Sequence, residues 1–98
     1  MNICITGASS GIGRELTKQL IKDGHSVWGI ARRENLLKDL KKELGNSFLY
    51  TACDVSDQNE VLKISQDMGK MGFSPEVIIL AAGAFLNDIN PELNYEIF

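Results

Sequence analysis

The sequence lacks any apolar run long enough to span a membrane, and its first apolar stretch is too short for a signal peptide and has no basic residues before it. We therefore expect a cytoplasmic protein with no membrane partner. Basic residues are also few: ten stand against thirteen acidic ones, which gives a net charge of -3. That is the wrong sign for a general binder of nucleic-acid phosphates, so nucleic acid is not an expected partner.

Patterns that indicate metal sites, disulfides or several domains are missing as well. Cys4 and Cys53 lie in apolar, strand-like segments without the spacing of metal ligands, and we interpret them as reduced core residues. The single histidine, His25, lies in a polar turn and is interpreted as a solvated turn residue. No linker-like segment divides the 98 residues, which predicts one small domain or part of one.

Strand-like and helix-like segments alternate along the chain. β-Branched and apolar runs predict strands at 2–6, 26–31, 47–53 and 76–82. Apolar residues at helical spacing predict helices at 11–23 and 34–44, a third whose N-cap is Ser56 or Asp57 and which ends before Gly72, and the start of a fourth at 93–98. This alternation predicts an α/β fold, half of a doubly wound parallel sheet in the order three-two-one-four with flanking helices.

A glycine-rich loop, Thr6-Gly-Ala-Ser-Ser-Gly-Ile-Gly13, joins the first strand to the first helix. Such a loop exposes backbone N–H groups and the positive end of the helix dipole, and both suit a pyrophosphate. Glycine is needed where a Cβ would block that approach. The spacing is not Gly-x-Gly-x-x-Gly, and the absence of Gly-Lys-Ser/Thr excludes a P-loop. A tight turn that only packs the helix on the sheet is the alternative interpretation.

Thr-Gly-x-x-x-Gly-Ile-Gly is the spacing of classical short-chain dehydrogenases/reductases. The chain resembles the N-terminal, cofactor-binding part of that family over all its 98 residues. The resemblance implies a Rossmann-type domain that holds a dinucleotide through the loop residues Gly7, Ser9, Ser10, Gly11, Ile12 and Gly13. A sugar-nucleotide epimerase of the extended branch is disfavoured, because that branch favours Gly-x-x-Gly-x-x-Gly.

Two arginines, Arg32 and Arg33, follow the second strand, where many dinucleotide folds carry a carboxylate that binds the adenosine ribose. Arg32 can contact a 2′-phosphate through two hydrogen bonds, and Arg33 can add charge or stack on adenine. In the family a basic residue here accompanies NADP preference, although other NADP-preferring members have a second one where this chain has Ser10. We expect NADP, with NAD as the alternative. The alternative interpretation is that the two arginines only provide a solvated start to the next helix. It is disfavoured, because cations are poorly placed at a helix N-terminus.

Asp54-Val55 after the third strand resembles the family's Asp-Val, whose aspartate binds the adenine amino group. A turn-capping role for Asp54 before the third helix is an equal alternative, and both can hold at once.

The segment after the fourth strand, Leu80-Ala-Ala-Gly83, stands where the family has Asn-Asn-Ala-Gly. Ala82 and Gly83 keep the small residues that let the backbone run close to the cofactor ribose. Leu80 and Ala81 depart from the pattern and remove two amide side chains that tie this strand end to its surroundings.

The catalytic residues of the family have no match. The residue four positions after Tyr50 is Asp54, and the given sequence has no residue four positions after Tyr95, so neither tyrosine forms Tyr-x-x-x-Lys. The asparagine of the family's proton relay is expected beyond Phe98. The resemblance therefore implies the NADP(H)-binding part of an oxidoreductase that is inactive by itself and meets a small-molecule substrate only in a longer form. A non-catalytic dinucleotide sensor or interaction module is the alternative function.

The predicted fourth strand poses a further problem, because its apolar run Val77–Leu80 would be an exposed sheet edge. Such an edge is a template for pairing with another chain. Two hypotheses follow: the chain is a truncated piece of a longer reductase, or it pairs through this edge with itself or another polypeptide.

Overall fold

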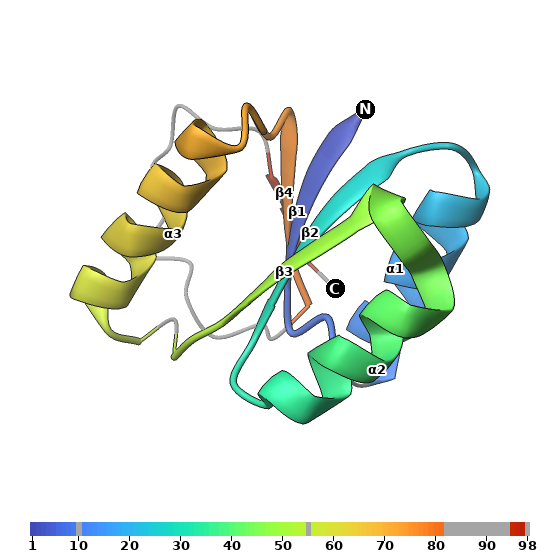
Figure 1. The fold of residues 1–98 in the computed structure, drawn as a ribbon, viewed down its shortest axis with the longest axis horizontal. Helices are drawn as coiled ribbons and strands as arrows, with labels where there is room; N and C mark the ends of the chain where they lie inside the picture. The colour runs from blue at the N-terminus through green and yellow to red at the C-terminus, as the bar shows by residue number, and fades with distance from the viewer. Residues whose placement is uncertain (10, 55, 82–94, 98) are drawn as a thin grey trace.

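The computed structural model describes residues 1–9, 11–54, 56–81 and 95–97. In these residues one parallel sheet has the strand order β3-β2-β1-β4-β5, with helices on both faces (Figure 1). The elements in chain order are β1 (Asn2–Thr6), α1 (Gly11–Lys22), β2 (Ser26–Ala31), α2 (Glu34–Leu44), a 3-10 turn η1 (Gly45–Ser47), β3 (Phe48–Ala52), α3 (Gln58–Lys70), β4 (Val77–Leu80) and β5 (Tyr95–Ile97). The predicted parallel α/β sheet and its order three-two-one-four are confirmed.

The ends of the elements follow from local hydrogen bonds. α1 ends at Lys22, one residue before the predicted end, because the amides of Gly24 and His25 turn back to bond the carbonyls of Ile21 and Leu20. Gly24 has a φ of 94°, which favours glycine at this C-terminal position. β3 and β4 are shorter than their predicted ranges of 47–53 and 76–82, whereas β1, β2 and α2 match theirs.

The segment 93–98 departs from the prediction. We expected the start of a helix there, and this was wrong: Tyr95–Ile97 is a strand that pairs in parallel with β4, with Tyr95 opposite Ile78 and Ile97 opposite Leu80. The side of β4 offers Tyr95–Ile97 a ready row of backbone hydrogen-bond partners, and this pairing decides the structure of these three residues.

The same pairing corrects the expectation about the fourth strand. β4 lies between β1 and β5 and is not an open edge, and the outer strands among the described residues are β3 and β5. A second chain that paired with β4 would have to displace β5. Within the described residues the premise of the predicted self-association through β4 is therefore absent, and self-association itself stays a prediction.

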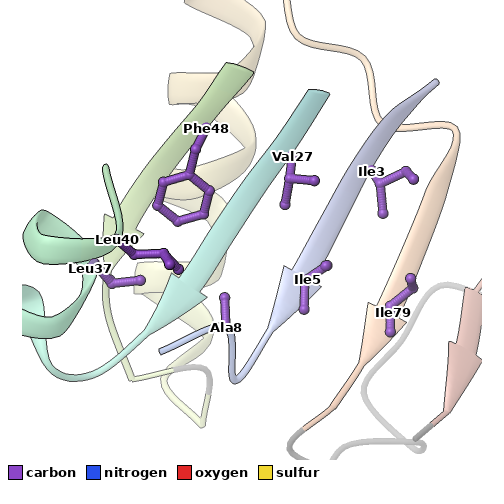
Figure 2. Close-up of a cluster of buried hydrophobic side chains, with 8 residues drawn as sticks. All are labelled: Ile3, Ile5, Ala8, Val27, Leu37, Leu40, Phe48 and Ile79. Atoms are coloured by element: carbon purple, nitrogen blue, oxygen red, sulfur yellow. The ribbon is translucent and has the colours of Figure 1, made fainter. Parts of the chain in front are cut away.

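Two apolar clusters fill the space between the sheet and its helices, because successive strand residues point to opposite faces. On the side of α1 and α2, the cluster shown in Figure 2 comprises Ile3, Ile5, Ala8, Val27, Leu37, Leu40, Phe48 and Ile79. On the side of α3, the second cluster comprises Cys4, Trp28, Ile30, Cys53, Ile64, Met68 and Phe73. No helix in the described part of the chain is long and apolar enough to cross a membrane.

Both cysteines lie in the second cluster and are buried, as expected of core residues. Burial raises the pKa of Cys4 to about 12 and that of Cys53 to about 11. Their thiols are therefore protonated at neutral pH and are poor nucleophiles.

Gly29 in β2 provides a test of how tightly the sheet packs. A Cβ there would lie 2.7 Å from Cε1 of the fully buried Phe48 and 2.9 Å from Cβ of Ala8. We expect Gly29→Ala to lower the free energy of unfolding by about 1–3 kcal/mol through overpacking. Urea denaturation measures the change.

Gly69→Ala is the matched control, because a Cβ at this position in α3 meets no atom within 4 Å. It should raise stability by about 1 kcal/mol through better helix propensity. Equal stability of the two variants would contradict the packing assigned to Gly29.

Candidate functional site

The loop between β1 and α1 has a backbone that only glycine adopts readily. Gly7 has a φ of 73° and Gly11 a φ of 55°, both in the left-handed region. The amide of Gly7 donates a 2.8 Å hydrogen bond to the carbonyl of Ile30, which ties the loop to the end of β2. The loop is therefore fixed at the carboxyl edge of the sheet.

Gly13 is required for a different reason. A Cβ on this residue would lie 2.1 Å from the carbonyl oxygen of Gly7 and 3.1 Å from Cβ of Ala81. Thr17 holds the same turn of α1 by donating a 2.7 Å hydrogen bond to the carbonyl of Gly13. Close packing of helix on sheet thus accounts for Gly13, whereas backbone angles account for Gly7 and Gly11.

The N-terminus of α1 points its free backbone donors at this edge. The first helical turn, which begins at Gly11, has no acidic side chain. At the other end of the helix, the last turn contains one basic residue, Lys22. The first amides of a helix have no intrahelical acceptor and carry the positive end of the dipole. With no carboxylate in this turn to neutralise it, the helix start suits an anion. Ile12 beside it is 63% exposed.

Thr6 at the end of β1 is a polar site residue that the sequence reasoning did not single out. The residue is buried, yet its Oγ1 has no hydrogen-bond partner among the residues that the structure describes. Its register partner on β4 is Leu80, and the next residue, Ala81, offers only its backbone amide, which donates to the Thr6 carbonyl at 3.2 Å. The apolar side chains at 80 and 81, which depart from the family pattern, give the hydroxyl no partner.

Arg32 and Arg33 follow β2 and are exposed. Arg33 is the N-cap residue of α2 but makes no side-chain capping hydrogen bond, and Glu34 opens the helix. Local structure therefore gives neither arginine a capping role, which leaves both guanidinium groups available at the carboxyl edge of the sheet.

Asp54 follows β3, next to the end of β2. The Cys53 amide donates to the Ala31 carbonyl at 2.9 Å, so Arg32 and Asp54 leave neighbouring strands at the same edge. Hydrogen bonds from the hydroxyl and amide of Ser56 hold the pKa of Asp54 below its usual value, and the charge of Arg32 adds to the shift. The Asp54 carboxylate is therefore ionised at neutral pH.

The turn before α3 uses Asp54 and Asp57 for different tasks. Asp57 is the N-cap of α3 and accepts a 2.9 Å hydrogen bond from the amide of Asn59, which matches one of the two predicted caps. Asp54 closes the preceding turn through Ser56, which was one of the two roles predicted for it. Its contact with adenine stays a prediction.

The predicted site residues that the structure describes gather at one edge of the sheet. Gly7, Ser9, Gly11, Ile12 and Gly13 follow β1, the two arginines follow β2, and Asp54 follows β3. The strand order reverses at β1: α1 and α2 on one face carry the chain from β1 to β2 and β3, and α3 on the other face returns it to β4 on the far side of β1 (Figure 1). Ligands of open α/β sheets bind at such a switch point. The remaining predicted site residues, Ser10, Val55, Ala82 and Gly83, lie outside the described residues.

A family model described as short chain dehydrogenase matches residues 1–96. The chain belongs to the short-chain dehydrogenase family. A probable NADP-dependent dehydrogenase of Dichelobacter nodosus is 36% identical over 86 residues, which cover 88% of this chain and 81% of that protein. An NADPH-dependent pterin aldehyde reductase of Arabidopsis thaliana is 35% identical over 83 residues, which cover 83% of this chain and 34% of that enzyme.

Solved structures of short-chain dehydrogenases share this arrangement of strands and helices. The closed form of a serine dehydrogenase complexed with NADP+ superposes with a TM-score of 0.77 at 26% identity, over 81% of this chain and 32% of that one. The chain likewise spans about a third of the length of several curated relatives, at 32%, 34% and 35%.

Thr6 and Thr17 allow a matched test of the Thr6 hydroxyl, which has no hydrogen-bond partner among the described residues. Both are buried, but only Thr17 has a hydrogen-bond acceptor in the described structure. Since an unsatisfied buried polar group costs about 1–3 kcal/mol, we expect Thr6→Val to raise the free energy of unfolding by about 1 kcal/mol.

Thr17→Val removes a formed hydrogen bond and should lower the free energy of unfolding by about 1 kcal/mol. Urea denaturation compares the two variants. A loss of stability in Thr6→Val as large as in Thr17→Val would show that the Thr6 hydroxyl is paired.

Proposed function

We propose that this chain is the NADP(H)-binding portion of a short-chain dehydrogenase/reductase that transfers hydride between the nicotinamide and a carbonyl or alcohol. The observation that carries the proposal is the joint position of a glycine loop, a helix start without acidic residues and two exposed arginines at one edge of the sheet. The NADP dependence in the names of the two relatives supports the same cofactor.

The loop fits the pyrophosphate of such a cofactor. Gly7, Gly11 and Gly13 carry no side chain, and the first amides of α1 are free to donate. We assign the pyrophosphate to this loop, with Ser9, Ser10 and Ile12 beside it. When bound, the cofactor supplies or accepts the hydride, and the chain's own residues bind and orient it.

The adenosine end would lie over the ends of β2 and β3. Arg32 matches a 2′-phosphate in charge and geometry, and Arg33 adds positive charge. Asp54 is ionised and accepts hydrogen bonds, which suits the adenine amino group. We assign Val55, the next residue in the sequence, to the same end of the cofactor. We place Ala82 and Gly83 beside the ribose, after β4.

We assign no catalytic group to this chain. Its 98 residues contain no Tyr-x-x-x-Lys, the arrangement in which the tyrosine donates the proton and the lysine lowers the tyrosine pKa. The chain binds a dinucleotide but holds no residue that we assign to proton transfer. A substrate would meet the cofactor only in a longer form of the protein.

Arg32→Ala tests the 2′-phosphate assignment. Loss of a charge-assisted contact should weaken NADPH binding roughly tenfold or more and leave NADH binding nearly unchanged, because only NADPH carries the phosphate. Titration followed by NADPH fluorescence or calorimetry measures both affinities.

Lys22→Ala is the matched control, because Lys22 is an exposed cation in the last turn of α1, at the opposite end of the helix from the glycine loop. It should leave both affinities unchanged. An equal loss of NADPH and NADH binding in Arg32→Ala would refute the phosphate role.

The purified 98-residue chain is expected to bind NADPH without oxidising it when carbonyl compounds are added, because it lacks the proton donor. The absorbance of NADPH at its long-wavelength band follows the reaction. Carbonyl-dependent oxidation of NADPH by the chain alone would overturn the division between binding and catalysis.

A further inference from the structure

We propose that Ser56 is a positioning residue for the cofactor: it fixes the Asp54 carboxylate so that one oxygen faces outward as an acceptor for the exocyclic amino group of the purine. This inference rests on the proposed function. It adds a residue, Ser56, for which the sequence indicated only a helix-capping role.

Ser56 binds only one of the two carboxylate oxygens of Asp54. Its hydroxyl donates to Oδ1 at 2.7 Å and its amide donates to the same Oδ1 at 3.0 Å. Among the described residues Oδ2 has no hydrogen-bond partner, and Asp54 is exposed. The carboxylate is thus held by one oxygen and offers the other to solvent.

The backbone of Asp54 is fixed independently of its side chain, since its carbonyl accepts a 3.0 Å hydrogen bond from the amide of Asp57. The Asp54 amide donates a 2.7 Å hydrogen bond to Oε2 of Glu60, and the preceding residue, Cys53, is buried and bonded to the Ala31 carbonyl at 2.9 Å. The side-chain torsions are the remaining freedom of Asp54, and the two bonds from Ser56 restrict them. An acceptor fixed in advance binds with a smaller loss of conformational entropy.

Ser56 also keeps Asp54 separate from Arg32. The two residues leave neighbouring strands, and the charge of Arg32 acts on the Asp54 carboxyl. Nevertheless, no ion pair within 4 Å joins them among the residues that the structure describes. Without Ser56, the Asp54 carboxylate could rotate toward the Arg32 guanidinium and form an ion pair with it. Neither group would then be free to bind the cofactor. With Ser56 in place, Arg32 stays free for a phosphate and Asp54 for an amino group.

The experiment compares NADPH with its hypoxanthine analogue, in which the exocyclic amino donor is replaced by a carbonyl oxygen. Wild-type chain should bind NADPH more tightly, because the analogue places an acceptor against the Asp54 carboxylate. Ser56→Ala should reduce that preference by about three- to tenfold, the range expected for loss of hydrogen bonds that orient the acceptor. Ser56→Thr keeps the hydroxyl and should restore the preference.

Two further variants bracket the effect. Asp54→Asn offers an amide donor to the analogue's carbonyl and should abolish or reverse the preference for adenine. Ser65→Ala removes an exposed serine on α3 outside this turn and should change neither affinity. Circular dichroism checks that each variant is folded.

A carboxyl titration by NMR gives a second measurement that needs no ligand. The bonds from Ser56 favour the ionised form, so Ser56→Ala should raise the pKa of Asp54 toward its ordinary value, and Ser56→Thr should not. An unchanged Asp54 pKa in Ser56→Ala would show that Ser56 does not hold the carboxylate, and would overturn the inference.

The binding outcomes separate this inference from the proposed function. If wild type binds neither dinucleotide, both are refuted. If wild type binds both equally well, or if Ser56→Ala weakens both to the same degree, the chain is a dinucleotide-binding domain but the positioning role of Ser56 is refuted.

Discussion

The approach of Gly13 to the carbonyl oxygen of Gly7 sets the position of α1, and the candidate site depends on that position. A Cβ at residue 13 would lie 2.1 Å from this oxygen, so the first turn of the helix reaches the end of β1 only with glycine there. The turn brings its free amides to the carboxyl edge of the sheet without an acidic side chain beside them. The first turn of α1 thus serves both the packing of the helix on the sheet and the candidate anion site.

The parallel sheet brings together groups that are far apart in the sequence. Parallel strands end at a common edge, so the glycine loop, Arg32 and Asp54 face the same region although they are separated by up to about fifty positions. Two hydrogen bonds across the strand ends, from Gly7 to Ile30 and from Cys53 to Ala31, hold these segments in place. The cation and the carboxylate can then act on different parts of one ligand.

The fourth strand shows how a departure from the family pattern affects both packing and polar pairing. Leu80 is buried and in register with Thr6, and Ala81 lies close to where a Cβ on Gly13 would be. These apolar residues fill the space but give the buried Thr6 hydroxyl no partner in the described structure. β5 covers the outer side of β4, so the apolar run that suggested an exposed edge lies within the sheet.

The sequence by itself determined the family, the order of the strands and helices, and the glycines and arginines of the candidate site, because periodicity and the glycine pattern are local signals. β1, β2 and α2 matched their predicted ranges for this reason. Three features were decided by tertiary structure alone. The strand at Tyr95–Ile97 depends on the free side of β4. The lack of a partner for the Thr6 hydroxyl among the described residues depends on the register with Leu80. The fixed carboxylate of Asp54 depends on the fold of the turn that brings Ser56 and Glu60 to it, and neither these distances nor these pairings can be read from spacing in the chain.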